Sequence, residues 1–152
     1  MQARMKQPVF VIPEALKAMQ TFAKCAENHG VPPATLALVH MRISQINGCA
    51  VCLDLHNVPD FFPKDTDARN MTVAAWRDAP FFTDAERAAL GLAEAVTRLP
   101  DRADPVPDDV WAEAARHYDE TALAALLIEI AAVNVWNRLN VATRQVAGAY
   151  KR

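Results

Sequence analysis

The segment CAVCLDLH brings two thiols and an imidazole close together in the chain. Cys49, Cys52 and His56 are separated by three and four residues, so on a helix their side chains share one face. A free thiol is mostly protonated at neutral pH, and a helix N-terminus or an adjacent imidazolium favours its thiolate. We therefore expect Cys52 to be the attacking thiolate, with His56 as its base or charge partner, directly or through one water. Cys49, one turn earlier, would resolve a Cys52 sulfenic acid into a disulfide.

Three other interpretations of this segment stay open. Cys49 and Cys52 could be small buried hydrophobic residues, with His56 a hydrogen-bonded surface residue. The same three side chains could bind zinc if His40 or Cys25 supplied a fourth ligand, although the chain has no second paired motif. A thioredoxin fold would need a strand before the motif, and the preceding LALVHMRISQI is more typical of a helix. We expect no bound metal and no cofactor.

Helix signals cover most of the chain, and strand signals are scarce. Gly occurs only four times, and no long stretch alternates β-branched with polar residues. Cys49 falls in the first turn of a helix that begins after a break at Asn47-Gly48, and Thr83 with Glu86 forms a capping box. The predicted helices span residues 13–30, 36–47, 49–59, 66–79, 83–99, 108–118 and 121–150, the last with one break. We predict an all-α fold with a single domain, 1–152.

Composition limits the expected partners and location. Hydrophobic residues make up 52% of the chain and charged residues 22%, a balance typical of a globular protein with a filled core. The net charge is −2 and the basic residues are scattered, so no nucleic-acid partner is expected. The N-terminal apolar stretch is too short for a signal peptide. The longest apolar run, 122–135, is interrupted by Glu129 and is shorter than the roughly 20 residues that cross a bilayer. We expect a cytoplasmic protein with no membrane partner.

The last predicted helix combines an apolar start with a polar continuation. Residues 121–132 are apolar on nearly every side, so this segment is either central or buried at a subunit interface, and we expect self-association. Asn134, Asn137 and Asn140 follow, and amides are costly to bury unpaired. We expect them to hydrogen-bond across helices or subunits. Arg138 is a further candidate for substrate binding.

Three segments of the chain resemble a known family. LALVHMRISQINGCAVCLDLHN is similar to the core motif of the alkylhydroperoxidase-D-like branch of the carboxymuconolactone decarboxylase superfamily, and AWRDAPFFTDAERAALGLAEAVTRL and VNVWNRLNVATR are similar to its downstream segments. The resemblance implies an all-helical protein that assembles as a trimer or hexamer. It also implies peroxide reduction by a Cys pair, with a lipoyl or other thiol as the reductant. The family's Cys pair falls on Cys49 and Cys52, and its motif His falls on His56.

The chain departs from this family in the proton relay. The family often has a Glu twelve residues ahead of the first Cys, where this chain has Ala37. Glu86, Glu94 and His40 are the candidate replacements, and we include Glu86 among the catalytic candidates. The presence of Glu86 is explained equally well by its position in the capping box. Glu94 could instead be solvated, and His40 could be a hydrogen-bonded histidine near the core.

Three functions from different classes follow from these observations. The leading hypothesis is a thiol-dependent peroxidase or disulfide oxidoreductase that acts on a small peroxide or disulfide, with Trp76, Phe81 and Phe82 as an apolar entrance or simply as core. The second is a decarboxylase or lactone-processing enzyme that does not use the thiols. The third is a non-catalytic helical interaction protein with a vestigial Cys pair, which the Ala at position 37 favours.

Overall fold

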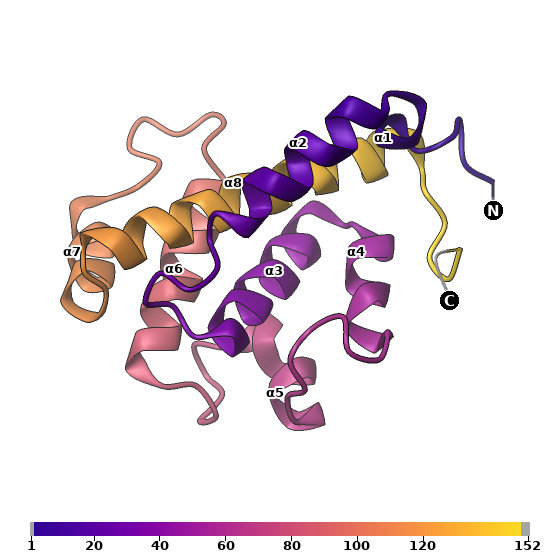
Figure 1. Ribbon diagram of the computed structural model, residues 1–152. Coiled ribbons are helices and arrows are strands. Elements are labelled where there is room, and N and C mark those ends of the chain that lie inside the picture. The colour runs from indigo at the N-terminus through magenta and orange to yellow at the C-terminus, as the bar shows by residue number, and fades with distance from the viewer. Residues whose placement is uncertain (1, 150–152) are drawn as a thin grey trace.

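The computed structural model describes residues 2–149, and all regular secondary structure within that range is helical. This confirms the predicted all-α fold. Figure 1 shows two long helices, α3 and α8, at the centre, with shorter helices around them. The elements in chain order are α1 (Pro8–Val11), α2 (Pro13–Lys24), α3 (Pro33–Asn47), α4 (Ala50–Asp54), η1 (Leu55–Asn57), α5 (Asp67–Thr72), η2 (Val73–Ala75), α6 (Asp84–Thr97), α7 (Asp108–His117) and α8 (Glu120–Thr143).

Local signals explain where several of these helices begin. Helices α1, α2 and α3 each have Pro in the first turn, where no intrahelical N–H is needed. The capping box predicted at α6 is present: Thr83 Oγ1 accepts from the Glu86 N–H, and the Glu86 carboxylate accepts from the Thr83 N–H. Helix α3 ends at Gly48, whose φ of 67° is a conformation that glycine adopts at little cost.

Helix α8 packs against α2, α3 and α6, so that its apolar side chains fill the main core. Ala122, Leu126 and Ile130 are almost fully buried there, together with Val39 and Ile43 of α3. By length and composition α8 could also cross a membrane, but half of its most apolar window is buried inside the protein. Its central position explains why residues 121–132 are apolar on nearly every side. Self-association is not needed to account for that segment.

The helices differ from the sequence-based prediction in number and in their end points. Helix α1 was not predicted, and α2 ends at Lys24 rather than at Gly30. The predicted helix 66–79 is shorter and tightens into η2, where positions three apart eclipse and both Val73 and Trp76 reach the core. Helix α8 is unbroken from Glu120 to Thr143 and is followed by the cap residue Arg144, which has a φ of 54°. Its interior Asn side chains bond to neighbouring elements, so they do not interrupt the helix. The predicted end at residue 150 lies outside the described residues.

Candidate active site

The turn between α3 and α4 places the two motif cysteines. The left-handed Gly48 reverses the chain, and the Cys49 N–H donates to the Ser44 carbonyl at 2.9 Å. Cys49 is therefore the N-cap of α4, one position before the first turn in which we expected it. Its sulfur accepts a hydrogen bond from the Cys52 N–H at 3.3 Å. The cap thus turns the Cys49 side chain back over the first turn of α4, toward Cys52.

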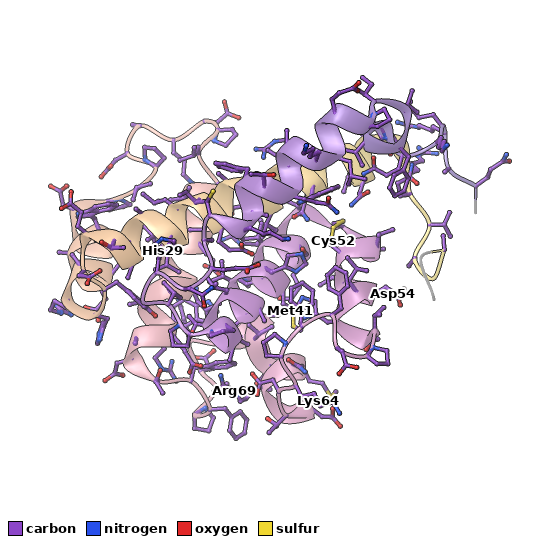
Figure 2. The ribbon with its side chains drawn as sticks, viewed as in Figure 1. His29, Met41, Cys52, Asp54, Lys64 and Arg69 are labelled. Atoms are coloured by element: carbon purple, nitrogen blue, oxygen red, sulfur yellow. A yellow bond between two sulfur atoms is a disulfide. The ribbon has the colours of Figure 1, made fainter. Side chains whose placement is uncertain are left out.

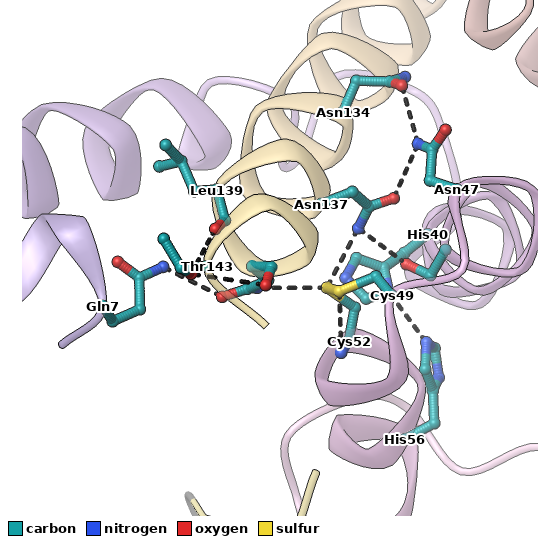
Figure 3. Close-up of a disulfide and its surroundings, with 12 residues drawn as sticks. Gln7, His40, Asn47, Cys49, Cys52, His56, Asn134, Asn137, Leu139 and Thr143 are labelled. Carbon is teal, nitrogen blue, oxygen red and sulfur yellow. Dashed lines mark hydrogen bonds between the residues drawn. A yellow bond between two sulfur atoms is a disulfide. The ribbon is translucent and has the colours of Figure 1, made fainter. Parts of the chain in front are cut away.

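Cys49 and Cys52 form a disulfide, and both side chains lie in the interior (Figure 3). Their Cα atoms are 5.3 Å apart, so the two sulfurs bridge within one turn as predicted. Each cysteine is only 1% exposed, and the buried side chain of Val51 packs with them in a small core cluster. Both sulfurs are therefore shielded from solvent in this conformation.

Two amides from α8 converge on the sulfur of Cys52. Asn137 Nδ2 donates to it at 3.1 Å and Asn140 Nδ2 at 3.4 Å. Asn137 Nδ2 also donates to Ser44 Oγ at 3.2 Å. These contacts confirm the expected hydrogen bonds across helices, but the sequence did not indicate that their target is the Cys52 sulfur.

His56 contacts His40 rather than a cysteine. The chain tightens into the 3-10 turn η1 at Leu55, which rotates His56 away from the helical register with Cys52. His56 Nε2 lies 2.9 Å from His40 Nδ1, and within residues 2–149 no hydrogen bond links His56 to either sulfur. Burial lowers the pKa of His56 to about 4, and burial together with the neighbouring His56 lowers the pKa of His40 to about 3. Both rings are neutral at pH 7, so one N–H donates to the other ring.

Phe62, in the loop after η1, covers the histidine pair. Its ring stacks on His56 with centroids 4.1 Å apart and is tilted against His40 at 4.6 Å. A cavity of about 380 Å³ opens beside them and is lined by Ala37, His56 and Phe62, among other residues. Phe62 is not among the residues predicted from the sequence, although its place among aromatic residues directly after the motif was a usable signal. The small side chain of Ala37, where the family often has Glu, borders this cavity.

Glu86 lies elsewhere and has other partners. Its carboxylate accepts from Thr83 and from Arg69, whose NH2 is 2.5 Å away. Burial acts to raise the pKa of Glu86, but the hydrogen bonds from Arg69 and Thr83 outweigh it and lower the pKa. Figure 2 shows Arg69, which lies on α5, well separated from Cys52. The structure does not bring Glu86 to the cysteines or to His56, and its position accounts for it as a capping and ion-pairing residue.

Glu94 is also held by partners away from the sulfurs, and it is buried rather than solvated. It accepts from Arg42 Nε at 2.6 Å, Trp76 Nε1 at 3.1 Å, Arg77 NH1 at 2.8 Å and Arg98 NH1 at 3.2 Å. Burial acts to raise its pKa, but hydrogen bonds led by those from Arg77 and Arg42 lower it to about 2. Glu94 therefore ties α3, η2 and α6 together. Of the three candidate relay residues, only His40 lies against His56.

The remaining candidates occupy ordinary positions. Trp76 and Phe82 are buried in a second core cluster, and Phe81 is 45% exposed, so these aromatics do not border the His56 cavity. Arg138 is exposed on α8, and Cys25 is a free, exposed thiol. In the described part of the chain, no group of three His, Cys, Asp or Glu side chains is arranged to hold a metal ion.

Fold and site together define an all-helical protein with a buried Cys-x-x-Cys pair and a histidine from the same motif. Residues 13–58 match the carboxymuconolactone decarboxylase family. The chain is 33% identical over 132 residues to YdfG of Bacillus subtilis, covering 87% of this chain and 88% of YdfG. It is 34% identical over 110 residues to YnjA of Escherichia coli, covering 72% of this chain and 59% of YnjA. The chain belongs to the carboxymuconolactone decarboxylase family, in its AhpD-like branch.

Solved structures agree with this assignment. ATU0492 of Agrobacterium tumefaciens, a protein of unknown function proposed to be the antioxidant defence protein AhpD, superposes with a TM-score of 0.84 at 27% identity, covering 97% of this chain and 99% of that one. The debrominase Bmp8 superposes with a TM-score of 0.79 at 24% identity, covering 93% of this chain and 75% of that one. At that identity, the second comparison shows a shared fold.

Proposed function

We propose that this protein is a thiol-dependent peroxidase or disulfide oxidoreductase that cycles Cys52 and Cys49. The observation that carries the proposal is that the two motif sulfurs lie at bonding distance, with two amide donors directed at only one of them. Membership of a family of enzymes that includes AhpD-like antioxidant proteins supports the same chemistry. A disulfide with a purely structural role would not need donors on one sulfur.

The proposed cycle balances without a cofactor. The Cys52 thiolate attacks the outer oxygen of a hydroperoxide, the O–O bond breaks, and the released alkoxide takes a proton to leave as an alcohol or water. The resulting Cys52 sulfenic acid reacts with the Cys49 thiol, which forms the disulfide and releases water. An external dithiol of the lipoyl type then reduces the disulfide by thiol–disulfide exchange. The dithiol is oxidised to its own disulfide, and Cys49 and Cys52 return to thiols.

The histidine pair fits a role in proton transfer better than a role as a charge partner. With pKa values of about 4 and 3, His56 and His40 carry no positive charge at neutral pH. A neutral imidazole can still relay a proton between solvent in the adjoining cavity and the released alkoxide. Because His40 contacts His56, we assign to it the relay role that the resemblance gives to the Glu absent at Ala37.

Access to the sulfurs requires local opening. Residues 55–66, which include η1, His56 and Phe62, form one wall of the cavity and are mostly loop. Segments of this kind open at a small fraction of the global unfolding free energy. We propose that this segment is the one displaced when peroxide or reductant enters.

The test treats the reduced protein with stoichiometric alkyl hydroperoxide and follows the thiols by mass spectrometry. In the wild-type protein, the mass of the peptide that contains Cys49 and Cys52 should fall by two hydrogens as the disulfide forms. Cys49→Ser should accumulate a sulfenic acid on Cys52 that dimedone traps, and Cys52→Ser should consume no peroxide. Cys25→Ser, which changes an exposed thiol outside the site, is the matched control and should behave as wild type.

Two results would count against the proposal. Thiols that stay unmodified after both peroxide and a disulfide substrate would favour a non-catalytic interaction protein with a vestigial Cys pair. Turnover of a carboxylated or lactone substrate that survives Cys52→Ser would favour an enzyme that does not use the thiols.

A further inference from the structure

We infer that Asn137 and Asn140 hold the Cys52 sulfur as a thiolate, and that Gln7 and Asn47 are positioning residues that keep both amides turned toward it (Figure 3). This inference rests on the proposed function, in which Cys52 is the attacking thiolate, and it identifies the groups that stabilise its charge. Three of these four side chains are buried, and the fourth, Asn47, is half-buried at the end of α3.

The first chain of hydrogen bonds begins at the backbone of α1. The Val9 N–H can only donate, and it donates to Gln7 Oε1 at 2.8 Å. The other end of that amide, Gln7 Nε2, therefore faces Asn140 and donates to its Oδ1 at 3.1 Å. Asn140 Nδ2 is then left facing Cys52 Sγ. An amide has its acceptor and its donor on opposite sides, so the backbone N–H fixes the direction of the whole chain.

A second chain begins at a backbone carbonyl of α8. The Ile130 carbonyl can only accept, and Asn134 Nδ2 donates to it at 2.9 Å. Asn134 Oδ1 therefore accepts from Asn47 Nδ2 at 3.0 Å, and the same Nδ2 donates to Asn137 Oδ1 at 3.0 Å. Asn137 Nδ2 is left facing Cys52 Sγ. The Val9 N–H and the Ile130 carbonyl therefore orient the two chains independently. Each chain ends with an amide N–H group that donates to the Cys52 sulfur.

The arrangement distinguishes the two cysteines. Within residues 2–149, the hydrogen bond recorded to Cys49 Sγ comes from the backbone N–H of Cys52, whereas Cys52 Sγ has two side-chain donors from α8. Hydrogen bonds to a charged form stabilise that form, and they do so more strongly in a buried, poorly solvated site. Among residues 2–149, no Lys or Arg side chain donates a hydrogen bond to either sulfur, and His40 and His56 are neutral. Fixed amide dipoles are the stabilising groups that remain.

The experiment titrates Cys52 alone, without relying on turnover. In a Cys25→Ser, Cys49→Ser background, Cys52 is the remaining thiol, and its ultraviolet thiolate absorbance is followed against pH. Asn137→Leu and Asn140→Leu each remove one donor with little change in volume. Since a hydrogen bond to a charged group is worth about one pH unit of titration, each should raise the midpoint by about one unit, roughly a tenfold loss of thiolate below the midpoint.

The positioning residues are tested by neutral substitutions that never touch the sulfur. Gln7→Met and Asn47→Leu release Asn140 and Asn137 to rotate, and each should raise the midpoint by a smaller amount, about half a unit. The matched control is Thr143→Val on the same helix, which removes a buried hydroxyl that donates to the Leu139 carbonyl. It should leave the midpoint unchanged while lowering the melting temperature.

The outcomes separate this inference from the proposed function. Midpoints in the Asn variants equal to that of Thr143→Val would overturn the inference, even if peroxide still oxidised Cys52. If the Asn variants raise the titration midpoint of Cys52 but the protein reacts with neither peroxides nor disulfides, the result would support the inference and contradict the proposed function. If Asn137→Leu fails to fold, Asn140→Leu and Asn47→Leu decide the result, because both lie at helix ends.

Discussion

The surroundings of Glu94 and Glu129 shift the pKa values of these two acidic side chains in opposite directions. Glu94 is surrounded by arginines, which keep its pKa near 2. Glu129 lies largely buried in α8, and the described residues provide it with no hydrogen bond or ion pair. Burial, and then the negative charge of Glu27, raise the pKa of Glu129 to about 7. The folded state thus stabilises the first carboxylate and destabilises the second.

Glu129→Gln should stabilise the protein in a pH-dependent manner. Because the pKa of Glu129 is higher in the folded than in the unfolded chain, the folded state binds more protons between pH 4.5 and 7, and its stability falls as pH rises through that window. The variant should gain about 3 kcal/mol in unfolding free energy at pH 8 and almost nothing below pH 4.5. Urea denaturation at several pH values measures this. Glu120→Gln, exposed on the same helix, should show no such gain, and a pH-independent gain in Glu129→Gln would contradict the assignment.

At the scale of elements, the site depends on how α3 ends and α4 begins. Gly48 lets α3 stop with a left-handed residue, so that Cys49 caps the next helix and Cys52 follows one turn later. A Cβ at position 48 would meet no atom within 4 Å. Its cost is therefore conformational rather than steric.

Gly48→Ala should lower the unfolding free energy by about 1 kcal/mol, because a residue with a Cβ is strained at this φ. Gly91→Ala is a control of opposite sign: Gly91 lies inside α6, the added Cβ is 3.8 Å from Trp76, and a helix interior favours Ala by about 0.5–1 kcal/mol. Chemical denaturation of both variants, under one fixed redox condition, gives the comparison. Equal signs for the two variants would show that Gly48 does not act through its backbone conformation.

The whole molecule retains an apolar groove on its outer face. Helices α2 and α8 form it, with a volume of about 210 Å³, and its walls include Met19, Phe22, Val135 and Trp136. Phe22 and Val135 are each 42% exposed. We expect this face, rather than the apolar start of α8, to mediate the self-association that the sequence suggested.

Light scattering should therefore give a mass that is a multiple of one chain, and Val135→Glu should reduce it, since a charge in an apolar interface is costly. Met71→Glu is the matched control, because Met71 is 82% exposed on α5, away from the groove. A monomeric wild type, or equal masses for both variants, would exclude the groove as the interface.

Spacing along the chain was sufficient for the all-helical class, the Thr83 capping box and the bridge between Cys49 and Cys52, because each depends on contacts within four residues. The sequence also indicated that Asn137 and Asn140 need partners. Packing alone decided that their partner is the Cys52 sulfur, 85 and 88 residues away. It likewise set His40 against His56 and Glu86 against Arg69. Such contacts depend on the distance and rotation between separate helices, and no local pattern specifies those quantities.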